Sequence, residues 1–118
     1  MKQQLATAPF FSIVIPSYNR IGFLPETLDS ILKQTFQDFE ILVVDDGSTD
    51  HTPEILRHKY GHLSNFRLIE QPNAERGAAR NHGFREASGS YVIFIDSDDL
   101  MLPEHLEVLR SHILRLNQ

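Results

Sequence analysis

The chain has 118 residues, of which 41% are hydrophobic, so it is long enough for one ordinary domain with a buried core. Sixteen acidic residues against eleven basic ones give a formal net charge of -5, which argues against non-specific nucleic-acid binding, because such binding needs a basic face. No cysteine occurs, which excludes disulfides, thiolate zinc sites and cysteine nucleophiles.

Short apolar segments alternate with helical patterns from residue 11 onward. We expect strands over residues 11–15, 40–44, 66–70 and 91–95, and helices over residues 23–34, 52–60, 75–87 and from 103 almost to the C-terminus. Pro16 is expected to close the first strand, because proline cannot donate to a strand ladder. We expect Thr52 to cap the second helix, with Pro53 at its first helical position, and Pro103 to open the fourth helix.

The third helix is unusual for its small residues, Gly77, Ala78, Ala79 and Gly83. Such residues let a helix backbone approach a sheet closely.

Four strand–helix units with nearly continuous apolar strands predict an α/β fold, a doubly wound and mostly parallel sheet with helices on both faces. Residues 1–10 are expected to form an N-terminal tail and residues 11–118 the domain. Ligands of such sheets bind where the carboxyl ends of the strands lie, which we call the carboxyl edge.

The last strand leads directly into three carboxylates, those of Asp96, Asp98 and Asp99. Its five apolar residues, from Tyr91 to Ile95, predict a central strand buried on both faces. Three like charges at the end of such a strand repel one another unless a cation lies among them, and carboxylate oxygens suit Mg²⁺ or Mn²⁺. The alternative is that Asp98 and Asp99 cap the following helix, where acidic residues are favoured.

Polar residues also follow the first two strands. Pro16, Ser17 and Tyr18 follow the first, and Asp45 and Asp46 follow the second. Because parallel strands bring their carboxyl ends to one edge, acidic residues from two separate strands are expected to meet there. Helix capping does not explain all of them, so the sequence predicts a metal-bridged phosphate site.

Four segments, in this order and spacing, resemble the nucleotide-binding half of the family 2 glycosyltransferases, which are inverting enzymes of the GT-A fold. They are SIVIPSYNR (12–20), ILKQTFQDFEILVVDDGSTD (31–50), RGAARNHGF (76–84) and GSYVIFIDSDD (89–99). The resemblance implies a nucleotide-diphosphosugar donor, usually a UDP-sugar, bound with Mg²⁺ or Mn²⁺. It also implies transfer of the sugar to a hydroxyl of a saccharide or other acceptor.

The resemblance assigns a nucleotide-binding role to Pro16, Tyr18, Asp45, Asp46 and Asp96, and the spacing of Arg76 and Arg80 adds these two arginines as candidates. Within this set, Tyr18 is expected against the uracil ring, Asp46 at the base and Asp45 in shaping the same loop. Asp96 and Asp98 form the DxD motif, with Asp96 near the ribose and Asp98 on the metal, and Asp96 is a second candidate metal ligand. The two arginines, spaced four apart on one helix face near its N-terminus, would add cationic donors towards the diphosphate or towards the first acidic residues of the edge.

Each assignment has a plainer structural alternative. Tyr18 could pack on the edge of the sheet, and the arginines could be solvated or paired with Glu75. Asp99 is interpreted as a cap of the turn into the fourth helix.

The family places its acceptor site and catalytic base downstream of the DxD strand. No residue of this chain is assigned as the base, which we expect downstream of Gln118, the last residue of the sequence. We therefore expect this chain to be the nucleotide-binding part, with the acceptor half absent, able to bind nucleotide without full activity.

Three other functional interpretations of the sequence remain open. One is a nucleotide-binding module without catalysis. A second is a sugar-phosphate nucleotidyltransferase, although such enzymes normally have a Gly- and Arg-rich loop after the first strand. A receiver-like phosphoacceptor domain would need a lone aspartate after the third strand and a later lysine, which are not present in that order.

No apolar run reaches signal-peptide length or the roughly 20 residues that span a bilayer, so we predict a cytoplasmic or cytosol-facing domain. The expected partners are a UDP-sugar and a hydroxyl acceptor, with no nucleic acid. Exposed apolar edges predict self-association into a homo-oligomer.

Overall fold

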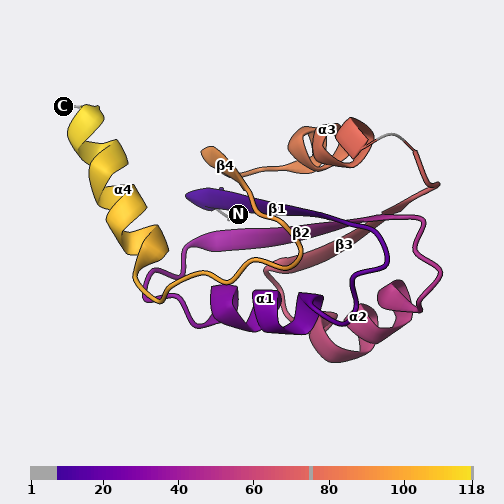
Figure 1. Cartoon of the computed structure of the whole chain (residues 1–118). Coiled ribbons are helices and arrows are strands. Elements are labelled where there is room, and N and C mark those ends of the chain that lie inside the picture. Colours follow the sequence, from indigo (N-terminus) through magenta and orange to yellow (C-terminus); the bar gives the residue numbers. More distant parts are fainter. Residues whose placement is uncertain (1–7, 75, 118) are drawn as a thin grey trace, which may run out of the picture.

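The computed structural model describes residues 8–74 and 76–117, in which four strands alternate with four helices (Figure 1). The strands are β1 (Phe11–Ser17), β2 (Phe39–Asp46), β3 (Phe66–Gln71) and β4 (Tyr91–Phe94). The helices are α1 (Leu24–Leu32), α2 (Thr52–Tyr60), α3 (Arg76–Glu86) and α4 (His105–Leu116). None of the helices in these two ranges is both long and apolar enough to cross a bilayer. Most of the expected N-terminal tail, residues 1–7, lies outside the described residues.

The four strands form one sheet in the order β3-β2-β1-β4, and every pairing is parallel. Figure 1 shows α3 on one face of the sheet and α1 and α2 on the other, while α4 leads away from the sheet. The predicted α/β fold with a parallel sheet and helices on both faces is therefore confirmed. Since all strands run the same way, their carboxyl ends share one edge.

The apolar strands supply side chains to both faces, because successive residues of a strand point to opposite sides. Ile13 and Ile15 of β1 belong to the larger core cluster, which includes α1 and α2 side chains. Val14 lies on the opposite face in a smaller cluster with Leu42 and Val44, against Ala79 of α3. All five strand residues are buried, and each such side chain contributes about 1.5–3 kcal/mol relative to an exposed one. Burial on both faces explains the nearly continuous apolar runs.

Helix α3 packs unusually close to the sheet at Gly83. A Cβ added there would lie 2.4 Å from Val14 Cγ1 and 3.1 Å from Val44 Cγ2. Ala79, one turn earlier, is also buried. The expected role of small residues is confirmed at these two positions, whereas Gly77 faces open space.

Strand β4 differs from its prediction. Within the described residues it pairs only with β1, so it is an edge strand and not a central one. Tyr91 and Phe94 remain more than a third exposed, and the strand ends at Phe94 instead of Ile95. The prediction of a central strand was wrong because an apolar run does not reveal whether a second strand pairs with its outer side. The prediction of burial on both faces was wrong too, since the burial pattern of the strand leaves its first and last side chains exposed.

Pro16 does not close β1, which continues to Ser17. The Val14 carbonyl accepts a hydrogen bond from the Ile95 N–H on the β4 side of β1. In a parallel ladder, residues two apart present their backbone polar groups to the same neighbour, so Pro16 also faces the β4 side. The β1–β4 register stops at Val14 and Phe94, and no ladder bond is therefore lost at the proline.

Two predicted helix starts also shift. Thr52 is the first helical residue of α2 instead of its cap, since the N-cap is His51 in the left-handed region at φ 66°. The carboxylate of Asp50 accepts hydrogen bonds from both the N–H and the hydroxyl of Thr52, so Asp50 supplies the capping oxygen. Pro103 lies in a turn before α4, whose N-cap is Glu104.

Candidate functional site

A cleft of about 580 Å³ lies at the carboxyl edge. Its lining comes from the ends of β1 and β2 with the loop after β1, the β3–α3 segment, helix α3 and the loop after β4. The lining residues are Pro16, Ser17, Tyr18, Arg20, Asp46, Asn73, Ala74, Ala79, Arg80, Asp96, Ser97 and Asp98. The structure thus brings together six of the predicted site residues from four parts of the chain.

Two predicted site residues are not among the lining. Asp45 is buried and points into the turn after β2, where its carboxylate accepts hydrogen bonds from the Ser48 N–H at 3.0 Å and the Ser48 hydroxyl at 2.5 Å. Asp45 therefore shapes the loop beside the cleft. The side chain of Arg76 and the whole of Glu75 lie outside the described residues.

The catalytic base was expected downstream of Gln118, and Gln118 also lies outside the described residues. No residue of the described part of the chain is assigned this role from the structure. The position of the base therefore stays a prediction.

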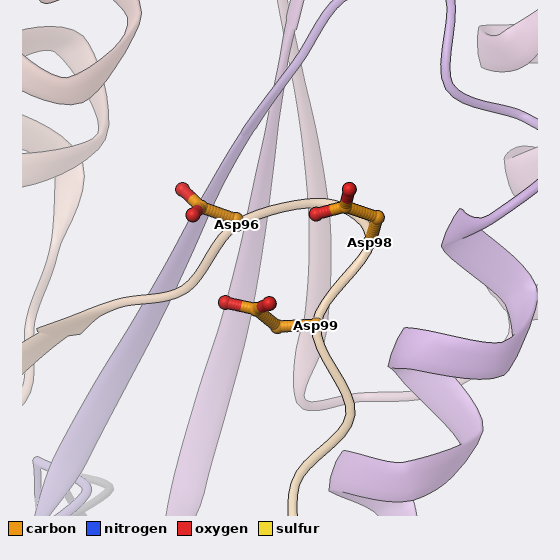
Figure 2. Close-up of side chains that lie close together, drawn as sticks. All are labelled: Asp96, Asp98 and Asp99. Atoms are coloured by element: carbon orange, nitrogen blue, oxygen red, sulfur yellow. The ribbon is translucent and has the colours of Figure 1, made fainter.

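The acidic cluster follows β4. Asp96, Asp98 and Asp99 are exposed, and one carboxylate oxygen from each lies within 4.8 Å of those of the other two. Figure 2 shows the three side chains projecting from this single loop. Neither Asp98 nor Asp99 caps α4, because that helix has Glu104 at its N-cap. Three converging carboxylates and no nitrogen or sulfur ligand suit a hard divalent cation such as Mg²⁺ or Mn²⁺.

Hydrogen bonds from the end of β3 and from the segment that joins β3 to α3 fix the Asp46 carboxylate. Its Oδ1 accepts hydrogen bonds from Gln71 Nε2 at 2.9 Å and from the Ala74 N–H at 3.0 Å. Among the described residues, its Oδ2 receives only a longer bond from Asn73 Nδ2, at 3.3 Å, while the same Asn73 amide donates to the Asp46 carbonyl at 2.9 Å. A carboxylate oxygen has two acceptor positions, so Oδ2 can still accept an N–H from a ligand.

Gly47, directly after Asp46, needs to be glycine. Its φ of 75° lies in the left-handed region, and a Cβ there would lie 2.7 Å from the Asn73 backbone nitrogen. The close approach allows the β3–α3 segment to reach the Asp46 carboxylate.

The loop after β1 is tied to the loop after β2. Asn19, itself at φ 53°, donates its N–H to the Ser48 hydroxyl at 2.8 Å, and its side-chain oxygen accepts the Thr49 N–H at 2.8 Å. Asp50 accepts the Ile21 N–H at 3.2 Å. Burial raises the pKa of Asp50, but hydrogen bonds from Thr52 and Ile21 lower it by more, so the net pKa lies below its usual range.

These ties fix the loop that carries Tyr18. Neither Asn19 nor Ser48 was predicted to have a role from the sequence. The one available signal was the asparagine at position 19, in the turn after a strand, because asparagine tolerates the left-handed backbone region that such turns use.

Helix α1 and the residues directly after it hold the loop that carries the acidic cluster. Thr27 donates its hydroxyl proton to the Ser97 carbonyl at 3.0 Å. The buried Gln34 donates to the Leu102 carbonyl at 2.6 Å, and its Oε1 accepts the Leu106 N–H at 3.0 Å. The second bond satisfies a first-turn N–H of α4, so one side chain fixes both the loop and the helix that follows. Sequence reasoning missed these contacts because they join residues about 70 positions apart.

An aromatic side chain and two cations complete the cleft. Tyr18 is 47% exposed, which favours a ligand-facing ring over packing on the sheet edge. The Arg80 guanidinium carbon lies 4.5 Å from the centre of the Phe94 ring, and that of Arg20 lies 5.9 Å from the Phe23 ring centre. Arg20 was not singled out from the sequence.

The sequence matches the model of glycosyl transferase family 2 over residues 12–118. The chain belongs to this family. The resemblance inferred from the four segments is therefore confirmed, as is the GT-A fold that it implied.

Among curated proteins, glycosyltransferase GlyA of Streptococcus pneumoniae is 42% identical over 103 residues, covering 87% of this chain and 15% of that protein. Among solved structures, S. aureus TarS 1-349 in complex with UDP-GlcNAc matches with a TM-score of 0.82 at 37% identity, covering 89% of this chain and 31% of that one. Mannosyltransferase PcManGT from Pyrobaculum calidifontis, in complex with GDP-Man and Mn²⁺, matches with a TM-score of 0.71 at 31% identity, covering 80% and 29%. This chain thus spans a third or less of the length of these relatives.

Proposed function

We propose that the protein carrying this chain is a glycosyltransferase that takes a nucleotide-diphosphosugar donor, a UDP-sugar, at the carboxyl edge with the help of a divalent metal. The observation that carries the proposal is that one cleft is lined by a fixed carboxylate, by an exposed aromatic ring and by two members of the acidic cluster, Asp96 and Asp98. The named activities and ligands of the related proteins support it.

The nucleoside would lie between Tyr18 and Asp46. A planar base packs well on an aromatic face, and Tyr18 is exposed enough to supply one. Uracil carries a ring N–H at N3, and Asp46 Oδ2 has an acceptor position open for it. Because Oδ1 already receives two hydrogen bonds, the carboxylate does not need to move when the base arrives.

The diphosphate would lie towards the loop after β4. Asp98, together with Asp96 and Asp99, would hold Mg²⁺ or Mn²⁺, and the bound ion would stabilise negative charge on the leaving diphosphate. The guanidinium groups of Arg80 and Arg20 line the same cleft and add donors for phosphate oxygens. The family resemblance supports transfer of a sugar to an acceptor hydroxyl with inversion.

The test is calorimetric titration of UDP into the 118-residue chain with and without Mn²⁺. We expect Mn²⁺ to strengthen UDP binding, and Asp98→Asn to remove most of this enhancement, because the substitution keeps the shape and removes a ligand charge. Asp38→Asn is the matched control, since Asp38 is exposed and precedes β2, at the opposite end of the strands. Equal enhancement in the wild type and in Asp98→Asn would contradict the metal assignment.

A further inference from the structure

Behind Asp46, a chain of hydrogen bonds continues away from the cleft. Gln71 Nε2 donates to Asp46 Oδ1 at 2.9 Å, and Gln71 Oε1 lies 2.9 Å from His82 Nδ1. The three residues come from β2, β3 and α3. Asp46 and Gln71 are register partners on neighbouring strands. His82 precedes Gly83, where α3 packs tightly against the sheet.

The atom types fix the direction of this chain of hydrogen bonds. An ionised carboxylate can only accept, so the Gln71 amide must turn its NH₂ towards Asp46 and its carbonyl oxygen towards His82. That oxygen can only accept, so His82 must carry a proton on Nδ1. Both the neutral Nδ1–H tautomer and the imidazolium satisfy this requirement.

Building on the proposed function, we propose that His82 and Gln71 are positioning residues that hold the Asp46 carboxylate in the orientation that binds the ring N–H of the base. His82 prevents the Gln71 amide from rotating, because the flipped amide would place its NH₂ against the Nδ1–H and its oxygen against the carboxylate. With the amide fixed, Asp46 Oδ1 is saturated by Gln71 and by the Ala74 N–H, and Oδ2 is left for the ligand. Neither residue lines the cleft.

A substitution at His82 should therefore weaken binding of the base and leave binding of the phosphates unchanged. The probes are uridine, which carries the base alone, and inorganic pyrophosphate with Mg²⁺, which represents the phosphate side. For His82→Leu in the 118-residue chain we expect uridine binding to weaken about two- to tenfold, the size of one net hydrogen bond, with pyrophosphate affinity unchanged. His58→Leu on the exposed surface of α2 is the matched control and should change neither affinity.

Two further variants separate positioning from a general loss of structure. His82→Asn places an amide N–H at the position of Nδ1–H and should restore most of the uridine affinity. Gln71→Met removes the link itself, and adding His82→Leu to it should weaken uridine binding no further, because contacts in one chain of hydrogen bonds are not additive. Gln71→Met also keeps the test open if His82→Leu does not fold.

The outcomes distinguish this proposal from the proposed function. If wild type binds neither uridine nor UDP, the proposed function fails. If Asp46→Ala weakens uridine binding but His82→Leu and Gln71→Met do not, or if the two losses add fully in the double variant, the positioning role is overturned while the nucleotide site stands. A matching loss of pyrophosphate affinity in His82→Leu would also overturn it.

Discussion

Replacing Gly83 with alanine tests whether close packing of α3 positions the cleft. The added Cβ would lie 2.4 Å from Val14 Cγ1, whereas packed carbon atoms sit about 3.5–4.0 Å apart. Val14 is fully buried in β1, so it has no solvent space into which to move. Overpacking of this kind typically costs about 1–3 kcal/mol, offset by a gain of up to about 1 kcal/mol from replacing a helical glycine.

We expect Gly83→Ala to lower the free energy of unfolding by about 1–2 kcal/mol, which corresponds to a loss of roughly 4–8 °C in melting temperature for a chain of this size. Gly77→Ala is the matched control in the same helix, because nothing lies within 4 Å of a Cβ at that position. It should leave stability unchanged or raise it. Chemical denaturation monitored by circular dichroism measures both variants.

A double-mutant cycle identifies the cause of the loss. In a Val14→Ala background the opposing Cγ1 is absent, so adding Gly83→Ala should cost little or become favourable. The reasoning is refuted if Gly83→Ala is as stable as Gly77→Ala, or if its cost is the same with and without the Val14 side chain.

Two further predictions concern carboxylates. Burial raises the pKa of Glu40, but hydrogen bonds from Ser12 and Ser88 and the charge of Arg67 lower it by more, so the net pKa lies below its usual range. The stabilisation that the ionised Glu40 carboxylate provides is therefore present above about pH 4.5 and is lost as the pH falls through the pKa of the folded state. Glu40→Gln should lower the free energy of unfolding at pH 7 by about 1–3 kcal/mol. Acid denaturation curves should show this difference between the variant and the wild type shrinking as the pH falls. Asp46→Ala should weaken UDP and uridine binding by the same factor in calorimetry, because its contact is to the base, and a loss with UDP alone would place Asp46 at the diphosphate.

The order of elements, the parallel sheet and the location of the acidic residues were predictable because they depend on local patterns. A strand buried on both faces is apolar throughout, and a polar residue after a parallel strand lies at the carboxyl edge whichever strand it follows. This is why Tyr18, Asp46, Asp96 and Asp98 were correctly placed together.

Features that depend on which segments become neighbours could not be predicted. The apolar sequence of β4 does not reveal that the strand lies at the edge of the described sheet. Whether Pro16 removes a backbone hydrogen bond depends on where the pairing between β1 and β4 stops. The pairing ends at Val14, before the proline, so no hydrogen bond is lost. Asp99 was interpreted as a cap because acidic residues are favoured near the start of a helix, whereas the N-cap of α4 is Glu104. The contacts of Gln34 and Asn19 likewise join distant segments.

The most direct test of the account is to locate UDP on the chain by titrating it, with Mg²⁺, into ¹⁵N-labelled protein and following the backbone amide signals. The account predicts that the largest shifts occur at the carboxyl edge, at Tyr18, Gly47, Ala74 and Ser97. The amide of Gly89, which donates to Ser12 at the opposite end of the sheet, should not shift. Shifts centred on Gly89, or no shifts at saturating UDP, would contradict the assignment of the carboxyl edge as the nucleotide site.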